Sequence, residues 1–348
     1  MKKPEKSVSV RWLAKKAGVS VATVSRTLRQ PDTVAPHTRE KILRLVEAHR
    51  FVPDGRAANF SSRRAGVVGL IVPTISNSIY AEFTEAIQSR LQQAAGLSLL
   101  IANANYSAEI ESGIIRKLIE SRVEGVILTG YRRDASLYQL LEHYKIPFVV
   151  TWATSPKRSI PSISFDNREA ASEATEMLIK LGHRRIGLIC GIVAINDRAA
   201  QRLEAYRAVL AKYRIAFDPS LVSEQPFELE AAGEAAVRLM SSARPPTALF
   251  CANDIQALGA SFACQRMKLR VPDDVSIIGF DDLPIVRAAI PALSSVHVPA
   301  RQMGNAAADA LIAAARDGTP IKSQLIRTDI IMRASTAPPK SAKAGRGR

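Results

Sequence analysis

The chain has 348 residues, 47% of them hydrophobic and 23% charged, and its formal net charge is +16. This length suits two or three domains, and the composition is that of an ordinary globular protein. No apolar run approaches eighteen residues, and the lysine-rich start lacks the apolar core of a signal peptide, so we expect neither membrane insertion nor export.

The positive charge is concentrated at the two ends of the chain. Residues 1–64 contain 15 Lys and Arg against 5 Asp and Glu, and residues 338–348 contain four basic residues and no acidic one. Residues 65–337, with 29 basic and 27 acidic residues, are nearly neutral. A small basic unit on a near-neutral body is typical of a module that binds nucleic acid.

Three cysteines, Cys190, Cys251 and Cys264, form an odd set without the spacing of a metal site. Two of them follow apolar, strand-like runs, which favours small buried thiols in a reduced, cytoplasmic protein. The five histidines are scattered along the chain. We therefore expect no metal ion and no cofactor.

Residues 13–28 have the pattern of two short helices joined by a tight turn. Leu13 and Ala17 lie four residues apart on one face of the first helix. Gly18 supplies the positive φ that ends this helix. Ser20 is a natural N-cap for the second helix.

The outward face of the second helix carries small side chains, hydroxyls and one arginine, and no acidic residue. These residues are Val21, Ala22, Thr23, Ser25 and Arg26. Such a face fits the major groove and can hydrogen-bond phosphates and base edges. We interpret the stretch as a DNA-reading helix-turn-helix; the alternative is an ordinary helical hairpin.

Three further segments lie outside the two-lobed part of the chain: a third helix, a hinge and a C-terminal tail. A third helix is predicted from about Pro36 to His49, since proline suits the first helical turn. Residues 53–64 are too poor in apolar residues for an independent helix and are interpreted as a hinge. Residues 337–348 are rich in Pro, Lys, Gly and Arg and are predicted to be a disordered basic tail.

From residue 66 onward, short aliphatic runs alternate with helical segments. The predicted strands are 67–72, 97–102, 125–128, 147–151, one near 163, 186–190, 248–251 and 275–280. The predicted helices are 80–94, 108–120, 137–143, 168–181, 199–213, 230–241 and 255–267. This alternation predicts an α/β body of two doubly wound parallel sheets, each covered on both faces.

Polar and aromatic residues follow several of these strands, at the edge where such sheets bind ligands, here between two lobes. They include Trp152, Asn253 and Asp281, and Arg202 lies where it could cap the same cleft. Carboxylates, amides, an arginine and an indole suit a polyhydroxylated ligand, because the ring stacks on the indole and the hydroxyls bind the charged groups.

Purely structural roles stay open for the same residues. Asn167, Asn253 and Asp254 precede helices and could be N-caps. Arg202 could lie on a solvated face or in an ion pair, and Trp152 could be part of a core.

No enzyme motif accompanies this cleft. The chain lacks a nucleophile elbow, a phosphate-binding loop, a dinucleotide fingerprint and a zinc-protease motif. The adjacent Asp281 and Asp282 point in different directions and make a poor acid–base pair. We therefore expect no catalytic activity.

Taken in order, several segments resemble the LacI/GalR family of bacterial transcription regulators. They are residues 13–28, Pro53 with the segment after it, 75–77, 166–167, 181–186, 253–260, 271–275 and 279–282. Segments 28–32 and 264–266 look most like the gluconate-type repressors of that family.

The resemblance implies three parts. A three-helix DNA-binding domain would occupy residues 1–52 and a hinge 53–64, followed by a core like the periplasmic binding proteins at 65–336. The N-lobe of that core would hold residues 65–163 plus 295–323, and the C-lobe 164–294 plus 324–336. Ala35 departs from the family, which commonly has a Ser or Thr cap before Pro36.

The family's functional positions imply two binding sites. On DNA, Val21, Ala22 and Arg26 would meet base edges, Thr23, Ser25 and Arg29 would hold phosphates, and the hinge with Ala57 and Phe60 would enter the minor groove. In the cleft, the positions that would contact an effector are Tyr80, Trp152, Phe165, Arg202, Asn253 and Asp281.

These sites imply a homodimer that reads a palindromic double-stranded operator and responds to a sugar, polyol or sugar acid. The expected function is repression of a carbohydrate or sugar-acid catabolic operon. The alternatives are a periplasmic-type sugar-binding protein and a sugar-acting enzyme on the same two-lobed body.

Overall fold

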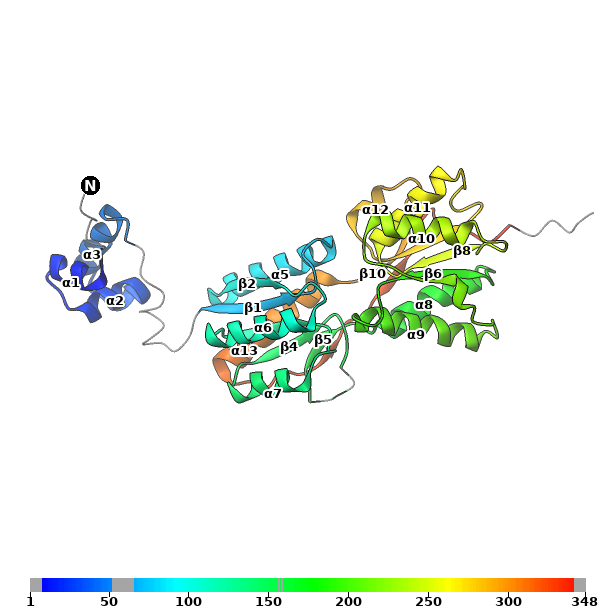
Figure 1. Ribbon diagram of the computed structural model, residues 1–348. Coiled ribbons are helices and arrows are strands. Elements are labelled where there is room, and N and C mark those ends of the chain that lie inside the picture. Colours follow the sequence, from blue (N-terminus) through cyan, green and yellow to red (C-terminus); the bar gives the residue numbers. More distant parts are fainter. Residues whose placement is uncertain (1–7, 52–65, 156, 158, 341–348) are drawn as a thin grey trace, which may run out of the picture. The chain divides into compact units, whose positions relative to one another are not determined.

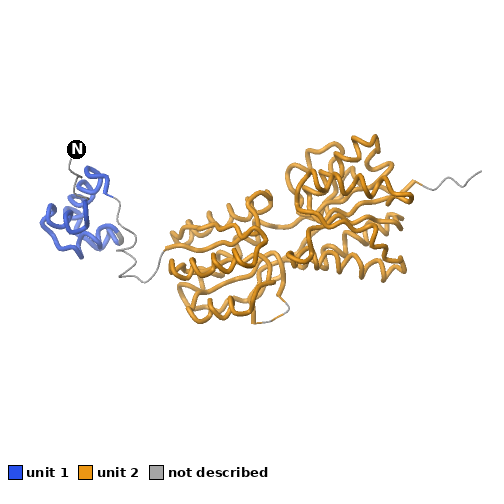
Figure 2. Tube along the Cα trace, in the orientation of Figure 1, with its two compact units in different colours: residues 1–65 blue, residues 66–348 orange. Residues whose placement is uncertain are grey.

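The computed structural model describes residues 8–51, 66–155, 157 and 159–340, and its chain divides into two compact units, residues 1–65 and 66–348 (Figure 2). The predicted hinge, with Ala57 and Phe60, lies outside the described residues, and so do residues 341–348 of the predicted tail.

The first unit has three helices, α1 (Val10–Ala17), α2 (Val21–Arg29) and α3 (Pro36–Ala48), with a 3₁₀ turn at Pro31–Thr33 (Figure 1). Gly18 ends α1 at φ 70°, in the left-handed region. Ser20 caps α2, its Oγ accepting a hydrogen bond from the Thr23 backbone N–H at 3.1 Å. Both signals that define the predicted helix-turn-helix are confirmed.

The core of this unit is small. Leu13, Ala17, Val24 and Ile42 are fully or almost fully buried and join the three helices. Ala35 precedes α3 without a side-chain cap, so this helix lacks the stabilisation of about 1 kcal/mol that a Ser or Thr would add.

The second unit consists of two lobes, each built on a six-stranded sheet (Figure 1). The first-lobe sheet has the order β11-β5-β4-β3-β1-β2 and is parallel throughout. Its strands are β1 (Val67–Val72), β2 (Ser98–Asn103), β3 (Gly125–Thr129), β4 (Phe148–Thr151), β5 (Ser162–Ser164) and β11 (Gln324–Leu325). Its helices are α5 (Ser78–Ala95), α6 (Ala108–Glu120), α7 (Ala135–His143) and α13 (Ala300–Asp317).

The second-lobe sheet has the order β12-β10-β9-β8-β6-β7, with only β12 antiparallel among these described strands. Its strands are β6 (Ile186–Cys190), β7 (Val222–Glu224), β8 (Ala248–Cys251), β9 (Ser276–Asp281), β10 (Ser294–His297) and β12 (Asp329–Ile331). Its helices are α8 (Asn167–Lys180), α9 (Asp197–Lys212), α10 (Leu229–Met240), α11 (Asp254–Arg266) and α12 (Pro284–Ala288), with a 3₁₀ turn at Pro219–Leu221.

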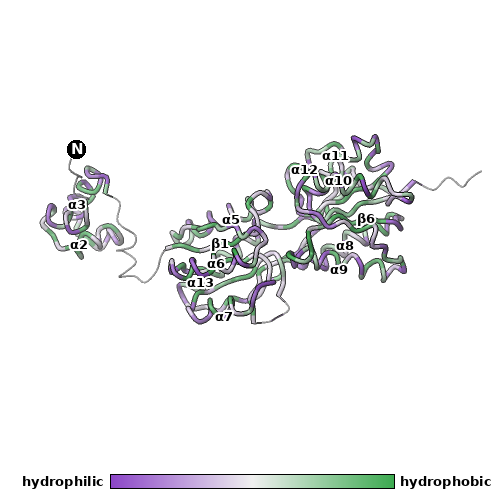
Figure 3. The backbone as a smooth tube through the Cα atoms, viewed as in Figure 1, coloured by the Kyte–Doolittle hydropathy of each residue, from purple (hydrophilic) through white to green (hydrophobic). Residues whose placement is uncertain are grey.

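The central strands of each sheet are buried on both faces, which explains their continuous aliphatic sequences, whereas the edge strand β2 is largely exposed. In β1, Val68, Leu70 and Val72 face a core that includes α5 and α13, whereas Ile71 faces a core that includes α6 and α7. The strands appear as hydrophobic stretches inside each lobe in Figure 3. The predicted doubly wound α/β fold is thus confirmed, and the predicted strands and helices agree with the observed ones to within about two residues.

The crossings between the lobes differ slightly from the expected division. Residues 295–297 belong to β10 and so to the second lobe, and residues 324–325 form β11 in the first, the reverse of the expected assignment. Both short strands lie at the crossings, where hydrophobic pattern alone does not distinguish one sheet from the other.

The predicted disorder of the tail is wrong for its first residues. Ala337 accepts hydrogen bonds from Ser276 Oγ at 2.9 Å and lies 3.0 Å from His183 Nε2, and Lys340 pairs with Asp274 at 2.7 Å. These contacts hold residues 337–340 against the second lobe despite their polar composition.

Candidate functional site

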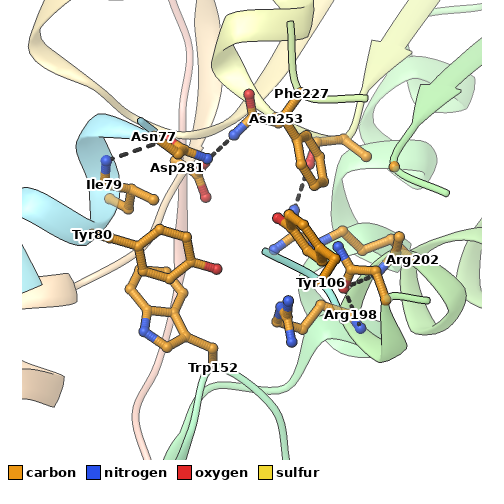
Figure 4. Close-up of a pocket in the computed structure, with 14 residues that line it drawn as sticks. Asn77, Ile79, Tyr80, Tyr106, Trp152, Arg198, Arg202, Phe227, Asn253 and Asp281 are labelled. Atoms are coloured by element: carbon orange, nitrogen blue, oxygen red, sulfur yellow. Dashed lines mark hydrogen bonds between the residues drawn. The ribbon is translucent and has the colours of Figure 1, made fainter. Parts of the chain in front are cut away.

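A small pocket lies between the two lobes, at the carboxyl ends of their strands (Figure 4). Its lining residues are Asn77, Ile79, Tyr80, Tyr106, Trp152, Gly191, Asn196, Arg198, Ala199, Arg202, Phe227, Ala252, Asn253 and Asp281. The lining therefore combines aromatic rings with two arginines, three asparagines and one carboxylate.

Asp281 is the one carboxylate among these lining residues. It is the last residue of β9, and Asn253 at the start of α11 donates from Nδ2 to its Oδ2 at 2.6 Å. Burial raises the pKa of Asp281 to about 7, although Arg202 and the Asn253 hydrogen bond act in the opposite direction. Asp281 is thus poised to gain or lose a proton near neutral pH.

Arg202 projects from α9 and is 6% exposed. Its Nε donates to Asn167 Oδ1 at 3.0 Å, its Nη1 donates to the Ala252 carbonyl, and its guanidinium lies 3.6 Å from the centre of the Phe280 ring. Burial lowers the pKa of Arg202 to about 10, against the influence of Asp281. The guanidinium is held rigidly, which favours directional hydrogen bonds to a ligand.

Aromatic rings form the walls of the pocket. Tyr80 and Trp152 meet edge to face with centroids 5.0 Å apart, and Tyr106 of the first lobe lies 6.3 Å from Phe227 of the second. The Trp152 indole N–H has no hydrogen-bond acceptor within the part of the chain that the structure describes. Aromatic walls of this kind bind the apolar faces of a sugar or another ring.

Five of the six predicted effector-contacting residues line this pocket: Tyr80, Trp152, Arg202, Asn253 and Asp281. The exception is Phe165, which is 1% exposed and packs behind the wall, 6.3 Å from Trp152 and 6.0 Å from Phe280. Phe165 supports the pocket and does not line it.

Some of these polar residues also have the structural roles that the sequence left open. Asn253 both caps α11, accepting from the Ile255 N–H at 2.8 Å, and lines the pocket. Asn167 bridges the Trp152 carbonyl, at 2.8 Å, and Arg202. Asp254 accepts from Ser295 Oγ and the Leu283 N–H, both at 2.6 Å, which is a structural role inside the second lobe.

Asp282 points away from the pocket, as expected for the neighbour of Asp281. Its carboxylate binds Arg333 at 2.6 Å, Arg287 at 2.9 Å and His297 Nδ1 at 3.1 Å. The two adjacent carboxylates therefore do not share a reacting group.

Sequence reasoning missed Tyr106, Arg198 and Phe227. Tyr106 follows β2, so the rule applied to the other strands would have found it. Arg198 precedes Arg202 by one helical turn on α9, a spacing that places both on one face. Phe227 lies in a loop after β7 and has no comparable signal.

The predicted DNA-reading residues lie on α2. Val21, Ala22 and Arg26 are exposed, while Thr23 and Ser25 are half-buried, and Arg29 is the last residue of the helix. The Thr23 hydroxyl also lies 2.8 Å from Ser20 Oγ, beside the cap. The outward face of α2 is therefore exposed enough to enter a groove of DNA.

Two further features bear on the site. The described residues contain no cluster of His, Cys, Asp and Glu suited to a metal ion. Within the same ranges, no helix combines the length and the apolar character needed to cross a membrane.

Comparison with known proteins identifies both units. Residues 13–54 match the family model "Bacterial regulatory proteins, lacI family", and residues 175–336 match "Periplasmic binding protein-like domain". The "HTH-type transcriptional repressor CytR" of Escherichia coli (strain K12) is 31% identical over 339 residues, which cover 96% of this chain and 98% of CytR.

Two solved structures extend the likeness. A lac repressor dimer bound to operator and the anti-inducer ONPF is 25% identical with a TM-score of 0.84, covering 95% of this chain and 100% of that one. A complex of the transcriptional regulator CelR with cellobiose is 28% identical with a TM-score of 0.70, covering 94% and 99%. These proteins are regulators and not enzymes, and this chain belongs to the LacI family of DNA-binding transcriptional repressors.

Proposed function

We propose that this repressor controls a carbohydrate catabolic operon and that a small polyhydroxylated effector, bound between its lobes, sets its affinity for the operator. The observation that carries the proposal is the pocket itself, in which Asp281 with Asn253 and the rigid Arg202 face the Tyr80–Trp152 wall. Paired hydroxyls bind carboxylate and guanidinium groups in bidentate fashion, and the ring face packs on the aromatic side chains.

The charges of the pocket favour a neutral sugar or polyol over a sugar acid. Arg198 pairs with Asp197 at 2.7 Å, and the second arginine, Arg202, lies near Asp281. The two cations are thus matched by two carboxylates when Asp281 is ionised. A sugar acid remains the second candidate, because protonation of Asp281 near pH 7 would leave one cation unmatched.

The DNA-binding half of the proposal rests on α2. Val21, Ala22 and Arg26 read base edges in the major groove, while Thr23, Ser25 and Arg29 hold phosphates. The hinge folds on the operator, with Ala57 and Phe60 in the minor groove. Because so few side chains of one α2 can reach bases, specific binding requires two copies of the helix, supplied by a homodimer on a palindromic site.

Calorimetric titration tests the effector site directly. A panel of neutral sugars, polyols and sugar acids is titrated into the full-length protein and into Asp281→Ala. At least one neutral polyhydroxylated compound is expected to bind the native protein and to lose at least about tenfold in affinity to the variant. Equal binding by both proteins would refute the assignment of the pocket.

A further inference from the structure

The two lobes are joined at the rim of the pocket by a set of hydrogen bonds that involves no ligand. It connects Tyr131 and Arg132, which follow β3 and Gly130 in the first lobe, to Asp197 at the start of α9 in the second, where Asp197 also pairs with Arg198. We infer that Asp197 is a positioning residue: it couples closure of the lobes to the orientation of Arg198 in the pocket. These five residues are called the latch below.

The Asp197 carboxylate is the centre of the latch. Its Oδ2 accepts backbone hydrogen bonds from Tyr131 at 2.6 Å and from Arg132 at 2.9 Å, both in the other lobe. Its Oδ1 accepts from Arg198 Nη1 at 2.7 Å. Asp197 is only 3% exposed, so these three donors replace water around a buried charge.

A second contact joins the same two lobes through a side chain. The Arg132 guanidinium, from the first lobe, donates through Nη1 to the Val193 and Ala194 carbonyls of the second lobe, each at 3.0 Å. In both contacts the first lobe donates to the second, through backbone N–H groups in one and through a guanidinium in the other. Opening the cleft would break both contacts together.

Gly130 permits this close approach. Its φ is +74°, and a Cβ there would lie 2.3 Å from Arg198 Nη1 and 2.7 Å from Asp197 Oδ1. Any larger residue would push the arginine and the carboxylate away from the first lobe. Glycine at this position therefore allows Asp197 and Arg198 to approach the first lobe, in addition to making a turn.

Arg198 links the latch to the ligand site. It lines the pocket, 7% exposed, and its Nη1 is bound by the carboxylate that the first lobe holds (Figure 4). Burial acts to raise the pKa of Asp197, but Arg198 and the two backbone N–H groups outweigh it and keep that pKa below its ordinary value. The carboxylate therefore stays charged at neutral pH, as the latch requires.

Because none of these bonds uses an effector atom, the latch stabilises the closed lobes of the free protein. A ligand shifts an open–closed equilibrium only by its differential affinity for the two states. Asp197 thereby reduces the free energy that the effector must supply to close the lobes. The latch concerns the same cleft as the proposed function, but it can be tested without an effector.

Trp152 offers a direct measure of cleft opening. The chain has two tryptophans, Trp12 in the first unit and the almost fully buried Trp152 in the pocket. In a Trp12→Phe background, acrylamide quenching of the ligand-free, full-length protein reports the accessibility of Trp152 alone. The test variant is Asp197→Asn, whose single amide oxygen cannot accept from all three donors and whose amide N–H faces Arg198.

The expected result is a rise of about twofold or more in the Trp152 quenching constant, with helix content unchanged by circular dichroism. Gly130→Ala, which displaces the same groups and keeps their charges, is expected to act in the same direction. The matched control is Glu204→Gln, since Glu204 also lies on α9 and pairs with Arg168 inside the second lobe. Its quenching constant is expected to equal that of the parent protein.

Unchanged quenching in folded Asp197→Asn and Gly130→Ala would overturn the proposal, as would an equal rise in Glu204→Gln. If Asp197→Asn does not fold, Gly130→Ala decides the question by itself. Failure here would leave the effector site intact, because the calorimetric test of the pocket depends on Asp281 and not on the latch.

Discussion

Ionised Asp281 is expected to destabilise the folded repressor at neutral and alkaline pH. Its pKa is raised from 3.8 to about 7 by burial in the pocket, so the fold disfavours the ionised form. Asp281→Asn replaces it with a neutral side chain of the same shape, whose oxygen can still accept from Asn253. Ligand binding will suffer, but the ligand-free variant should be the more stable protein above pH 7.

The magnitude follows from proton linkage. Between the unfolded pKa near 4 and the folded pKa near 7, the native state binds more protons than the unfolded state, so native stability falls as the pH rises. Each pKa unit corresponds to about 1.4 kcal/mol, which amounts to about 2–3 kcal/mol between pH 5 and pH 7. The stability that protonated Asp281 contributes is fully present below the pKa of the unfolded state. It is lost by the time the pH exceeds the pKa of the folded state.

The assay is urea unfolding of both proteins at several pH values, followed by Trp152 fluorescence in a Trp12→Phe background so that only the second unit is observed. The stability difference between Asp281→Asn and its parent should widen from pH 5 to pH 7 and stay constant above. Parallel curves across this range would mean that folded Asp281 ionises at an ordinary pKa, and the reasoning about its burial would be wrong.

Three other substitutions test separate parts of the structure. Arg26→Ala should cost about 1–3 kcal/mol on the operator and less on random DNA, as measured by gel shift; an equal loss on both would refute base reading. Ser20→Ala should destabilise the first unit by about 1 kcal/mol through loss of the α2 cap, seen in thermal unfolding followed by Trp12 fluorescence; an unchanged midpoint would refute the stabilising role of this cap. Gly279→Ala, whose Cβ would lie 2.1 Å from Asp254 Oδ1, should destabilise the second unit by about 1–3 kcal/mol in urea; a neutral result would show that this core can relax.

The fold was largely predictable because its signals are local. Gly18 and Ser20 mark a helix end and a helix start by their own chemistry, and both act as predicted. Strands buried on both faces, such as β1, read as unbroken aliphatic runs. Helix α13 was not predicted, although its buried positions, among them Met303, Ala307 and Leu311, recur at helical spacing and so carry the same local signal.

The site was predictable only where a strand end determines which way a residue faces. Asp281 and Asn253 follow directly from the ends of β9 and β8. Phe165 follows β5 in the same way, yet its ring is buried in the core between Trp152 and Phe280, a direction that the end of the strand alone does not determine. Phe227 enters from a loop of the second lobe, and only the three-dimensional path of that loop brings it opposite Tyr106.

We expect ligand binding in the pocket and operator binding to be coupled. This coupling is measured as the affinity of the full-length protein for an operator selected in vitro, by fluorescence anisotropy, with and without the polyhydroxylated compound that binds the pocket. We expect that compound to change operator affinity by about fivefold or more in the native protein and to have no effect on Asp281→Ala, which should still bind the operator. An unchanged operator affinity in the native protein at saturating ligand would contradict the account.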